Sequence, residues 1–501
     1  MLLPYQFFFF PILASLQKYV TNFHFLFSSS LWPISLPWIM TMEVKMVSRE
    51  CIKPSSPSPH HPKTHKMSLL DQFISPIYFH AILYYPADQD TVLNLDFISN
   101  RSHVLKQSLS DAINLYYPLA GKIKDDLSID CNDEGVCYKV AEVNSTSLSD
   151  YLSQPDLTQI TKFVPDVIAE NKVITSGDHV AMIQESRFAC GGITVRVVIS
   201  HTVFDGTSMS VFLRTWAAMA NKSSDHPQVV ISPNFNASFS FPPVDAFPKE
   251  ALLLPILGQF FKQGKCALRR FVFDASAIAR LKAMATSSGV KNPSRVEVVS
   301  ALLCKSTMKA KAGIRRSILI THPVNMRRRA VPAISESVVG NIVWLAAAAV
   351  FADEDLEWSS LLGKIREAIL KIDIDLVKSL QEGGENLFKL VNEIGGAAAA
   401  GFEAVIFGCW CNFGLYKVDF GWGNPWWVTN LPGYELAKSG YTTMHSLMDT
   451  RNNGVEAWAY MDEEEMSVLE NDRELLDFAS VDPSPLSQAN CDPHPLKMTL
   501  L

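Results

Sequence analysis

The residues best suited to chemistry lie in the stretch HTVFDG at 201–206. A histidine imidazole can take up a proton near neutral pH, and it does so best at the end of a rigid element. His201 follows the apolar run ITVRVVIS, which predicts a buried strand, so we expect it where a sheet meets a cleft. No G-x-S-x-G nucleophile motif lies nearby to recruit it. His201 is therefore a candidate general base acting on the substrate itself, and the competing interpretation is a core histidine bonded to a carbonyl.

The sequence on both sides of His201 predicts the elements that would position it. Residues 179–201 predict two strands separated by the Gly-Gly pair at 191–192. The stretch TSMSVFLRTWAAMA at 207–220 predicts a helix with N-cap candidates at its start. We expect Gly206 to give the intervening turn a positive φ, which other residues resist. A strand end, a turn and a helix start would together hold the imidazole at the rim of a sheet.

Other local patterns carry expectations about structure. Ser102 is a candidate N-cap for a helix whose apolar stripe includes Leu105. Strand-like runs on both sides of CNDEG, at 131–135, favour a hairpin there. The stretch GGAAAAG at 395–401 has low complexity and predicts a flexible linker. Mixed strands and helices along the chain indicate α/β layering.

The composition excludes several classes of protein. The chain has 501 residues, 48% of them hydrophobic, and a formal net charge of -7, so two or three domains with large cores are expected. Only RRR at 327–329 is locally basic, and we expect no nucleic-acid partner. Nine cysteines, an odd number, do not predict a disulfide framework. Cys409 and Cys411 form a C-x-C pair without a second pair to complete a zinc site, so we expect reduced thiols, no metal and a cytoplasmic location.

The first 41 residues differ from the rest of the chain. They carry one full charge, Lys18, and four prolines interrupt them. They therefore fall short of the roughly 18–20 uninterrupted apolar residues that a membrane-spanning helix needs, and we expect no stable membrane partner. At Met42 the sequence becomes polar, and we expect Met42, or Met40, to be the functional start and 1–41 to be an upstream extension. A signal anchor is the competing interpretation, although it would lack basic residues before the apolar run.

The remaining chain divides by composition. We expect a first domain over 42–221, which contains the histidine motif. A proline-rich crossover segment over 222–266 follows, then a second domain over 267–480. The polar, proline-containing tail over 481–501 is expected to be loose.

A second motif, DFGWG at 419–423, gives the histidine a family context. Together, HTVFDG and DFGWG resemble the BAHD family of plant acyl-CoA-dependent acyltransferases. The resemblance spans nearly the whole chain from Met42, and it includes in the same order MSLLDQ (67–72), YYPLAGK (116–122), CGG (190–192), SRVE (294–297), VNMRRR (324–329), GN (340–341) and MDTRNNGVEAW (448–458). The start at Met42 and the acidic last helix are most similar to the vinorine synthase-like branch, which includes acetyltransferases acting on alkaloids and other specialised metabolites.

This resemblance implies two α/β domains of chloramphenicol-acetyltransferase-like architecture. Each would have a mixed sheet flanked by helices, and a channel would run between the domains. His201 would remove the proton of an acceptor hydroxyl as its oxygen attacks the thioester carbonyl of acyl-CoA, with acetyl-CoA the expected donor. No acyl-enzyme, metal or permanently bound cofactor is implied. The protein would act as a monomer on a hydroxylated small molecule such as an alkaloid.

The resemblance also gives the motif residues structural roles. Asp205 would pair with Arg327 instead of completing a triad with His201.

The DFGWG residues would lie away from the channel and hold the architecture. Asp419 would pair with a basic group, Gly421 and Gly423 would permit close turns, and Trp422 would fill the core, with Phe420 part of the same structural motif. Direct contact of this motif with a ligand is the competing interpretation.

Two further segments have both a functional and a structural interpretation. Trp410 occupies a position that lies near the reacting carbonyl in the family, where its indole N–H could donate to the oxyanion. The family's threonine two residues earlier is Gly408 here, which puts that role in doubt. Ser294 and Glu297 form a capping box, S-x-x-E, and the family suggests that Ser294 and Arg295 also lie by the CoA channel, where a helix N-terminus favours phosphate.

Two other functions stay open on the sequence. The same base could serve N-acyl transfer to an amine. A family member that has lost catalysis and serves in binding is the second alternative. The intact His201 and DFGWG argue against this loss, whereas Gly408 and the alanine-rich stretch at 395–401 argue slightly for it.

Overall fold

The structure, a computed structural model, describes residues 42–487 except for 57–60, 88–94, 164–172, 222–228, 246, 312–315, 355–356 and 431–439. The chain divides into two compact units, 1–41 and 42–501, and the description that follows concerns the second unit. The expected upstream extension and the end of the expected tail, 488–501, lie outside the described residues. In the described part of the chain, no helix combines the length and apolar character that a bilayer span requires.

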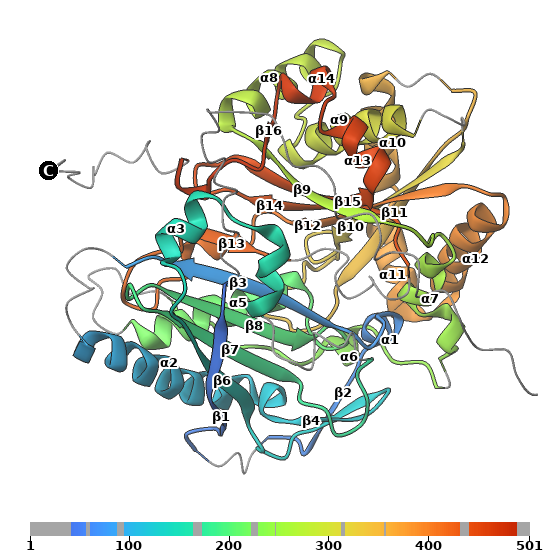
Figure 1. Ribbon diagram of the computed structural model, residues 1–501. Helices are drawn as coiled ribbons and strands as arrows, with labels where there is room; N and C mark the ends of the chain where they lie inside the picture. Colours follow the sequence, from blue (N-terminus) through green and yellow to red (C-terminus); the bar gives the residue numbers. More distant parts are fainter. Residues whose placement is uncertain are drawn as a thin grey trace, which may run out of the picture. The chain divides into compact units, whose positions relative to one another are not determined.

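A six-stranded mixed sheet forms the centre of the first half (Figure 1). Its strands are, in spatial order, β1 (Val44–Ile52), β6 (Val136–Val143), β7 (Ala181–Phe188), β8 (Ile193–Ser200), β3 (Tyr78–Tyr85) and β13 (Trp427–Thr429). β6 and β7 run parallel, and the other neighbours run antiparallel. The central strands β3 and β8 are buried along their whole length, which explains their continuous apolar runs.

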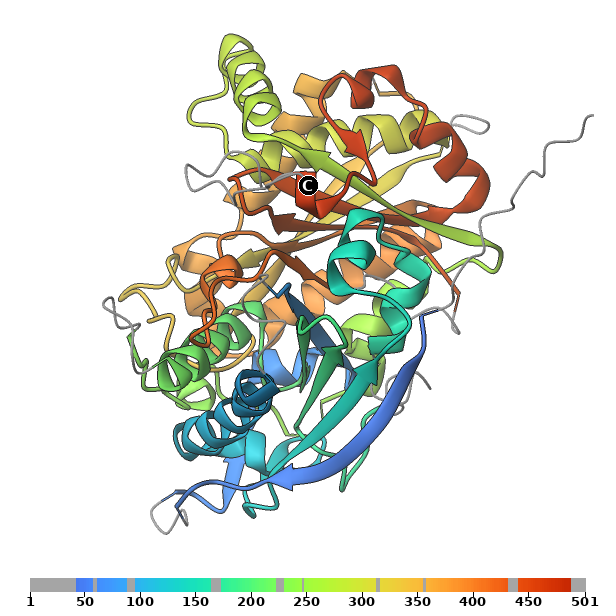
Figure 2. The ribbon, with the colours of Figure 1, turned by 60° about the vertical axis from the view of Figure 1, so that its left-hand side comes forward.

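Two helices pack side by side in the first half, α2 (Leu95–Leu115) and α5 (Gly206–Ala220) (Figure 2). The Trp216 indole of α5 is fully buried and donates a hydrogen bond to the Leu105 carbonyl oxygen of α2 at 3.2 Å. A small sheet also belongs to this half, in the order β2 (Thr64–Lys66), β5 (Ser128–Asp130) and β4 (Lys122–Asp125). α5 begins directly after the histidine turn, so it fixes where that turn lies.

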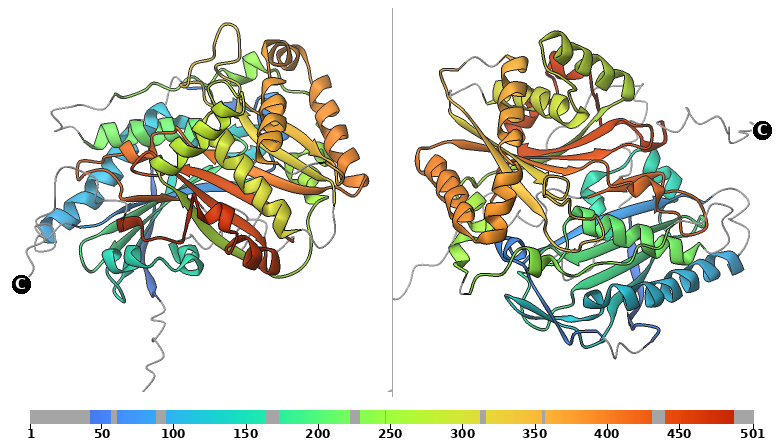
Figure 3. Two further views of the ribbon diagram at one scale, coloured as in Figure 1. Left: turned by 90° about the horizontal axis from the view of Figure 1, so that it is seen from above. Right: turned by 180° about the vertical axis from the view of Figure 1, so that it is seen from behind.

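A seven-stranded mixed sheet forms the centre of the second half. Its order is β11 (Val343–Val350), β10 (Ile318–Asn325), β12 (Glu403–Trp410), β14 (Thr443–Asp449), β15 (Val455–Asp462), β9 (Cys266–Phe273) and β16 (Ser480–Val481). β12 runs parallel to both β10 and β14. Helices α9 (Arg295–Ala310) and α10 (Trp358–Leu370) pack together against this sheet (Figure 3).

Shorter helices complete both halves. The α-helices are α1 (Leu69–Phe73), α3 (Leu148–Ser153), α6 (Ala237–Ser240), α7 (Leu253–Gly258), α8 (Ala275–Ser287), α11 (Ile374–Glu382), α12 (Glu385–Ala399), α13 (Glu463–Leu469) and α14 (Arg473–Leu476). The 3₁₀ turns are η1 (Tyr117–Ala120), η2 (Leu157–Phe163), η3 (Lys249–Ala251) and η4 (Leu415–Lys417). The fold is thus α/β with two mixed sheets and flanking helices, as expected.

Three local expectations were wrong. Ser102 is no N-cap, because α2 already runs from Leu95, and the Ser102 side chain instead binds Glu185. The strands on either side of 131–135 do not form a hairpin, since β5 pairs with β2 and β4 while β6 pairs with β1 and β7. The stretch at 395–401 is no flexible linker, because α12 continues through it to Ala399.

Two segments differ from the expected division of the chain. Residues 415–429 follow β12, yet their apolar side chains join the core of the first half, and β13 pairs with β3. The beginning of the expected loose tail is held in place: Val481 pairs with Phe271 of β9, and the Asp482 N–H donates to the Arg270 carbonyl oxygen at 2.9 Å. Both segments are held by partners that lie far away in the sequence, so the local sequence alone does not predict where they pack.

Candidate active site

A pocket of about 850 Å³ receives side chains from both sheets. From the first half come Phe79 of β3, His201 after β8 and the first residues of α5. From the second half come residues of β10 and β11 and the end of β12, including Trp410. The expected channel between the two halves therefore corresponds to a pocket, and His201 lies in its wall.

His201 is held at the end of β8 by its backbone and its ring. Its backbone N–H donates to the Ile77 carbonyl oxygen at 2.8 Å. The imidazole lies against the Phe79 ring, with 4.4 Å between ring centroids. The residue is half-buried and lines the pocket, so its ring is open to a bound molecule.

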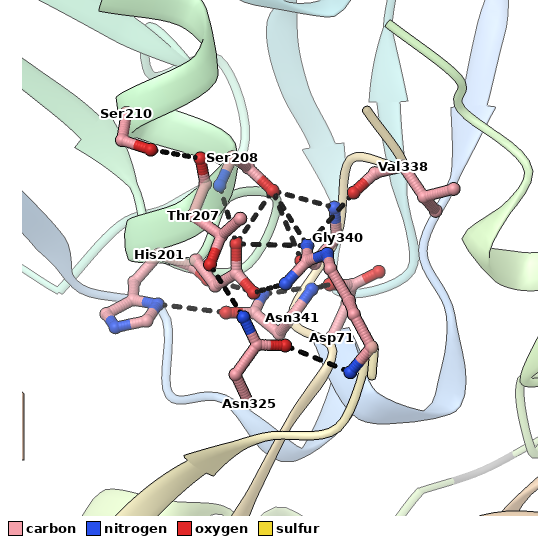
Figure 4. A network of polar contacts seen from close by, with 11 residues as sticks. Asp71, His201, Thr207, Ser208, Ser210, Asn325, Val338, Gly340 and Asn341 are labelled. Atoms are coloured by element: carbon pink, nitrogen blue, oxygen red, sulfur yellow. Dashed lines mark hydrogen bonds and ion pairs between the residues drawn. The ribbon is translucent and has the colours of Figure 1, made fainter. Parts of the chain in front are cut away.

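Asn341 fixes the tautomer of His201. The Asn341 Nδ2 group donates to two acceptors, Asp71 Oδ1 and the His201 carbonyl oxygen, each at 2.8 Å. The amide oxygen therefore points the other way, and it lies 3.1 Å from His201 Nδ1 (Figure 4). An amide oxygen only accepts hydrogen bonds, so Nδ1 carries the proton and Nε2 carries the lone pair. The neutral ring is thereby set up to accept a proton at Nε2.

Asp71 in turn holds Asn341. Its Oδ1 accepts from both the backbone N–H and the Nδ2 of Asn341 at 2.8 Å, and its Oδ2 accepts from the N–H and Oγ of Ser68. Burial raises the pKa of Asp71, while the hydrogen bonds from Ser68 and Asn341 act in the opposite direction. Asp71 lies in α1, whose apolar residues pack in the core of the second half, and Asn341 precedes β11, so this chain of contacts ties the histidine to the second half of the fold.

Asp205 forms the ion pair expected with Arg327. Arg327 Nη1 lies 2.6 Å from Asp205 Oδ2, and Nη2 lies 3.2 Å from Oδ1, with both residues buried. Asp205 is also the N-cap of α5, where its Oδ1 accepts from the Ser208 N–H at 2.8 Å. Arg327 Nη2 donates further to the carbonyl oxygens of Val338 and Gly340. The pair thus fastens the start of α5 to the segment that carries Asn341.

Gly206 is required for a different reason from the one expected. It is the first residue of α5, and its φ is not in the left-handed region, so the expected positive φ was wrong. A Cβ atom at Gly206 would lie 2.3 Å from Cε2 of the Phe413 ring. Any side chain at 206 would therefore require the Phe413 ring, which lies beside the start of the helix, to move.

The end of β12 forms another wall of the pocket. Gly408, Cys409, Trp410 and Cys411 all line it. The Trp410 ring lies 5.8 Å from the Phe79 ring that contacts His201. At Gly408, an added Cβ would meet Ser446 Oγ at 3.5 Å, which is an ordinary van der Waals contact.

Ser294 and Arg295 are engaged in contacts within the protein. Ser294 forms the expected capping box with Glu297 at the start of α9. Arg295 Nη2 lies 2.6 Å from both Asp449 Oδ1 and Asn412 Oδ1. Neither residue is part of the pocket lining, although Asn412 is, so Arg295 reaches the site through that neighbour.

The DFGWG motif lies outside the pocket lining. Asp419 Oδ1 accepts from the N–H groups of Gly421 and Gly423 at 2.8 and 2.9 Å, and both glycines have positive φ. Phe420 is buried with its ring 4.8 Å from Trp216 of α5, and it stacks on Trp422 at 5.7 Å. The turn of the motif is therefore held by hydrogen bonds to its own Asp419 carboxylate, and its aromatic rings pack against the first half.

The pocket has a charged side and an apolar side. On the charged side, Glu336 lies between Arg328, at 3.0 Å, and Arg214, at 4.0 Å, and Lys417 of η4 also lines the pocket. Two arginines that share one carboxylate leave a net positive charge. The apolar side chains of the lining are Phe73, Ile74, Phe79, Leu253, Pro323, Val343, Trp344, Leu345, Trp410 and Phe413.

Asn341 and Asp71 were not predicted as site residues from the sequence. Both stand in stretches that resemble the family, GN and MSLLDQ, which was the available signal. Their function depends on a contact across 270 positions, from Asp71 to Asn341, which no local pattern reveals.

The fold is that of an acyltransferase. The family model described as the Transferase family matches residues 42–476, and the chain belongs to this family, the BAHD family expected from its motifs.

Curated relatives act on specialised metabolites. An epi-neemfruitin B 7-O-acetyltransferase of Melia azedarach is 45% identical over 458 residues, which cover 89% of this chain and 100% of the relative. A limonoid 7-O-acetyltransferase of Citrus sinensis is 45% identical over 463 residues, with the same coverage. Among solved structures, vinorine synthase matches with a TM-score of 0.70 and 32% identity, over 87% of this chain and 99% of that one. The expected similarity to vinorine synthase is confirmed.

Proposed function

We propose that the protein is an acyl-CoA-dependent O-acyltransferase that esterifies a hydroxyl group of a polycyclic plant metabolite, with acetyl-CoA as donor. The observation that carries this proposal is the placement of His201: its Nδ1 faces Asn341 Oδ1, and its ring lines the pocket. A neutral imidazole with its lone pair at Nε2 is the protonation state that a general base needs.

The reaction follows from this arrangement. His201 Nε2 takes the proton of the acceptor hydroxyl as the oxygen attacks the thioester carbonyl. The tetrahedral intermediate collapses, the C–S bond breaks, and the CoA sulfur takes the proton back from Nε2. Trp410 is our candidate for stabilising the oxyanion, because it lines the same pocket. Asp205 and Arg327 take no part in proton transfer and keep the site in shape.

The two sides of the pocket suit two different substrates. We assign the phosphates of CoA to the charged side, with Arg214, Arg328 and Lys417, since guanidinium and ammonium groups pair with phosphate. We assign the acceptor to the apolar side, where Phe73 packs against Trp344 at 6.2 Å. An apolar wall of this kind suits a polycyclic alcohol, and the Citrus sinensis relative at 45% identity is named for a limonoid.

We further propose a monomer in a reducing, cytoplasmic compartment. The eight described cysteines are free thiols, which suits a reducing compartment. Sedimentation of the purified protein tests the monomer, and a mass of two chains would contradict it.

The first experiment tests the base. We expect His201→Ala to lower kcat by about 10²–10⁴-fold, the range of a positioned general base. Its melting temperature should stay close to that of the unchanged protein, because a half-buried ring at a pocket wall contributes little to the core. Turnover undiminished in this variant would refute the mechanism.

The second experiment tests the acceptor. The purified protein is incubated with acetyl-CoA and, separately, a limonoid with a free 7-hydroxyl, an alkaloid alcohol and a primary amine, and the products are identified by mass spectrometry. We expect the limonoid ester to form fastest. Amide formation without ester formation would instead establish N-acyl transfer, and no CoA release with any acceptor would favour a binding role.

A further inference from the structure

A buried hydroxyl beside the histidine turn carries a proton that no group in the described part of the chain accepts. Thr207 is the second residue of α5, and it lines the same pocket as His201. Its exposed fraction is 6%, so bulk water hardly reaches it. A buried donor without an acceptor is rare in proteins, and one in a pocket wall indicates a ligand.

The neighbouring amide of Asn325 fixes how the Thr207 hydroxyl is used. The Arg327 backbone N–H donates to Asn325 Oδ1 at 3.0 Å, so the amide oxygen is the atom that faces Arg327. The Asn325 Nδ2 group donates to Thr207 Oγ1 at 3.1 Å (Figure 4). Among the described residues, this oxygen has no other hydrogen-bond partner. The bond occupies a lone pair of Oγ1 and leaves its single O–H proton for a molecule in the pocket.

The groups that orient this hydroxyl are themselves held in place. Asn325 is the last residue of β10, and Arg327 forms the buried ion pair with Asp205, the N-cap of α5. The segment that donates to Thr207 is therefore tied to the helix that carries Thr207. A donor fixed in this way needs no reorientation when charge develops on its partner, which is the property of an effective oxyanion donor.

Two substrate oxygens meet beside His201 in the proposed reaction, and they need different partners. The oxygen of the acceptor must keep a lone pair to attack the carbonyl carbon while its proton passes to Nε2. The carbonyl oxygen of the thioester gains negative charge in the tetrahedral intermediate, so a hydrogen-bond donor stabilises it. The donor proton of Thr207 therefore suits the carbonyl oxygen and not the attacking oxygen.

The position of Thr207 on α5 agrees with this choice. Thr207 lies in the first turn of the helix, where the positive end of the helix dipole favours negative charge. The pocket-lining residues Thr207, Ser210 and Arg214 follow one another at helical spacing along one face. Because Arg214 belongs to the charged side that we assign to CoA, this face leads from the CoA phosphates to the reacting thioester.

We propose that the Thr207 hydroxyl donates a hydrogen bond to the thioester carbonyl oxygen of the acyl donor, and that it stabilises the oxyanion together with Trp410. The inference rests on the proposed function, since it names a further group that acts in the same reaction. Asn325 is then a positioning residue, which acts only through the hydroxyl of Thr207.

The experiment compares three variants of the full chain, using acetyl-CoA and the same set of acceptors. Thr207→Val removes the hydroxyl at nearly constant volume, and Thr207→Ser keeps it. Thr215→Val is the matched control, because Thr215 is a buried threonine of the same helix outside the pocket lining. For each variant, kcat, KM for acetyl-CoA and the melting temperature are measured.

Thr207→Val should lower kcat by about 10²-fold with little change in KM, which is the loss typical of one oxyanion donor. Thr207→Ser should keep most of kcat, because the hydroxyl remains. Thr215→Val should lower the melting temperature and leave kcat unchanged.

A fourth variant, Asn325→Asp, tests the orientation of the hydroxyl. A carboxylate cannot donate to Thr207 Oγ1, and it accepts the Thr207 proton instead, which turns the hydroxyl away from the pocket. We expect its kcat to fall towards that of Thr207→Val. Full kcat in Asn325→Asp would refute the positioning role.

Equal kcat in Thr207→Val and Thr207→Ser, in a protein that transfers acetyl groups, would refute the inference and leave the proposed function standing. A raised KM for acetyl-CoA at an unchanged kcat would also refute it, because the hydroxyl would then bind the ground state and the transition state equally. No transfer by the unchanged protein with any acceptor would overturn the proposed function, and this inference with it.

Discussion

Asn341 determines which nitrogen of His201 can accept a proton, because its own amide is held by Asp71 and by the histidine carbonyl. We expect Asn341→Ala to lower kcat by roughly 10²-fold, since Nδ1 loses its acceptor and the wrong tautomer becomes accessible. KM for both substrates should change little. Asn430→Ala removes a buried amide outside the pocket lining and is the control, with a lower melting temperature and an unchanged kcat. Equal kcat in the two variants would argue against the positioning role.

Asp205 shows how a residue next to the base can serve stability. We expect Asp205→Asn to lower the free energy of unfolding by about 3–5 kcal/mol, because it leaves the buried Arg327 guanidinium without its counter-charge. The control is Asp126→Asn, which removes an exposed pair with Lys249 and should cost less than about 1 kcal/mol. Urea unfolding measures both. A large loss of kcat in Asp205→Asn at an unchanged melting temperature would contradict this assignment.

At the scale of elements, sequence patterns predicted what local residues determine. The capping box at Ser294 and the strand before His201 are local, and both were predicted. The prediction of a flexible linker at 395–401 was wrong because this run continues helix α12. The helix is anchored by Leu387, Leu390 and Ile394, which are buried on one of its faces. Alanine then extends the helix readily. The prediction at Ser102 failed because its side chain binds Glu185 of β7, and no cap is needed inside a helix that begins at Leu95.

The second sheet contains two buried histidines whose titration makes its stability depend on pH. His322 of β10 and His445 of β14 both lie 5.2 Å from the Phe407 ring of β12. Burial lowers the pKa of His322 from 6.5 to about 4 and that of His445 to about 3. Between these values and 6.5 the unfolded chain binds protons that the folded chain does not, so stability falls as the pH falls through this window.

We expect the free energy of unfolding to decrease by up to about 1.4 kcal/mol per pH unit for each of these histidines as the pH falls from 6.5 towards 4. His322→Gln should make this slope shallower, because one proton uptake is lost. His103→Gln, at an exposed histidine of α2, should leave the slope unchanged. Denaturant unfolding at several pH values measures the slope, and equal slopes in the two variants would show that His322 does not contribute.

At the scale of the whole described unit, the segment from DFGWG to β13 joins the two sheets. Trp427 pairs with Tyr84 of β3, and their rings lie 5.0 Å apart. The same indole lies 5.9 Å from Trp458 of β15, and its Nε1 donates to Glu456 Oε1 at 3.2 Å. The sequence predicted the motif as structural but placed it in the second domain, because chain order does not show which sheet a short strand joins. The pocket lies between elements that this segment holds together.

Trp427→Ala should therefore weaken both halves at once. We expect it to lower the free energy of unfolding by about 3–5 kcal/mol, the range for a deleted core aromatic. Hydrogen exchange measured by mass spectrometry should become faster in β3 and in β15 together. Trp358→Ala removes an equally large buried ring from α10, which packs in the core of the second half alone, so faster exchange should be confined to that half. If exchange in β3 stayed slow in Trp427→Ala, β13 would only be an appended edge strand, and the two sheets would have to be held together by the contacts around Asp205 and Asn341.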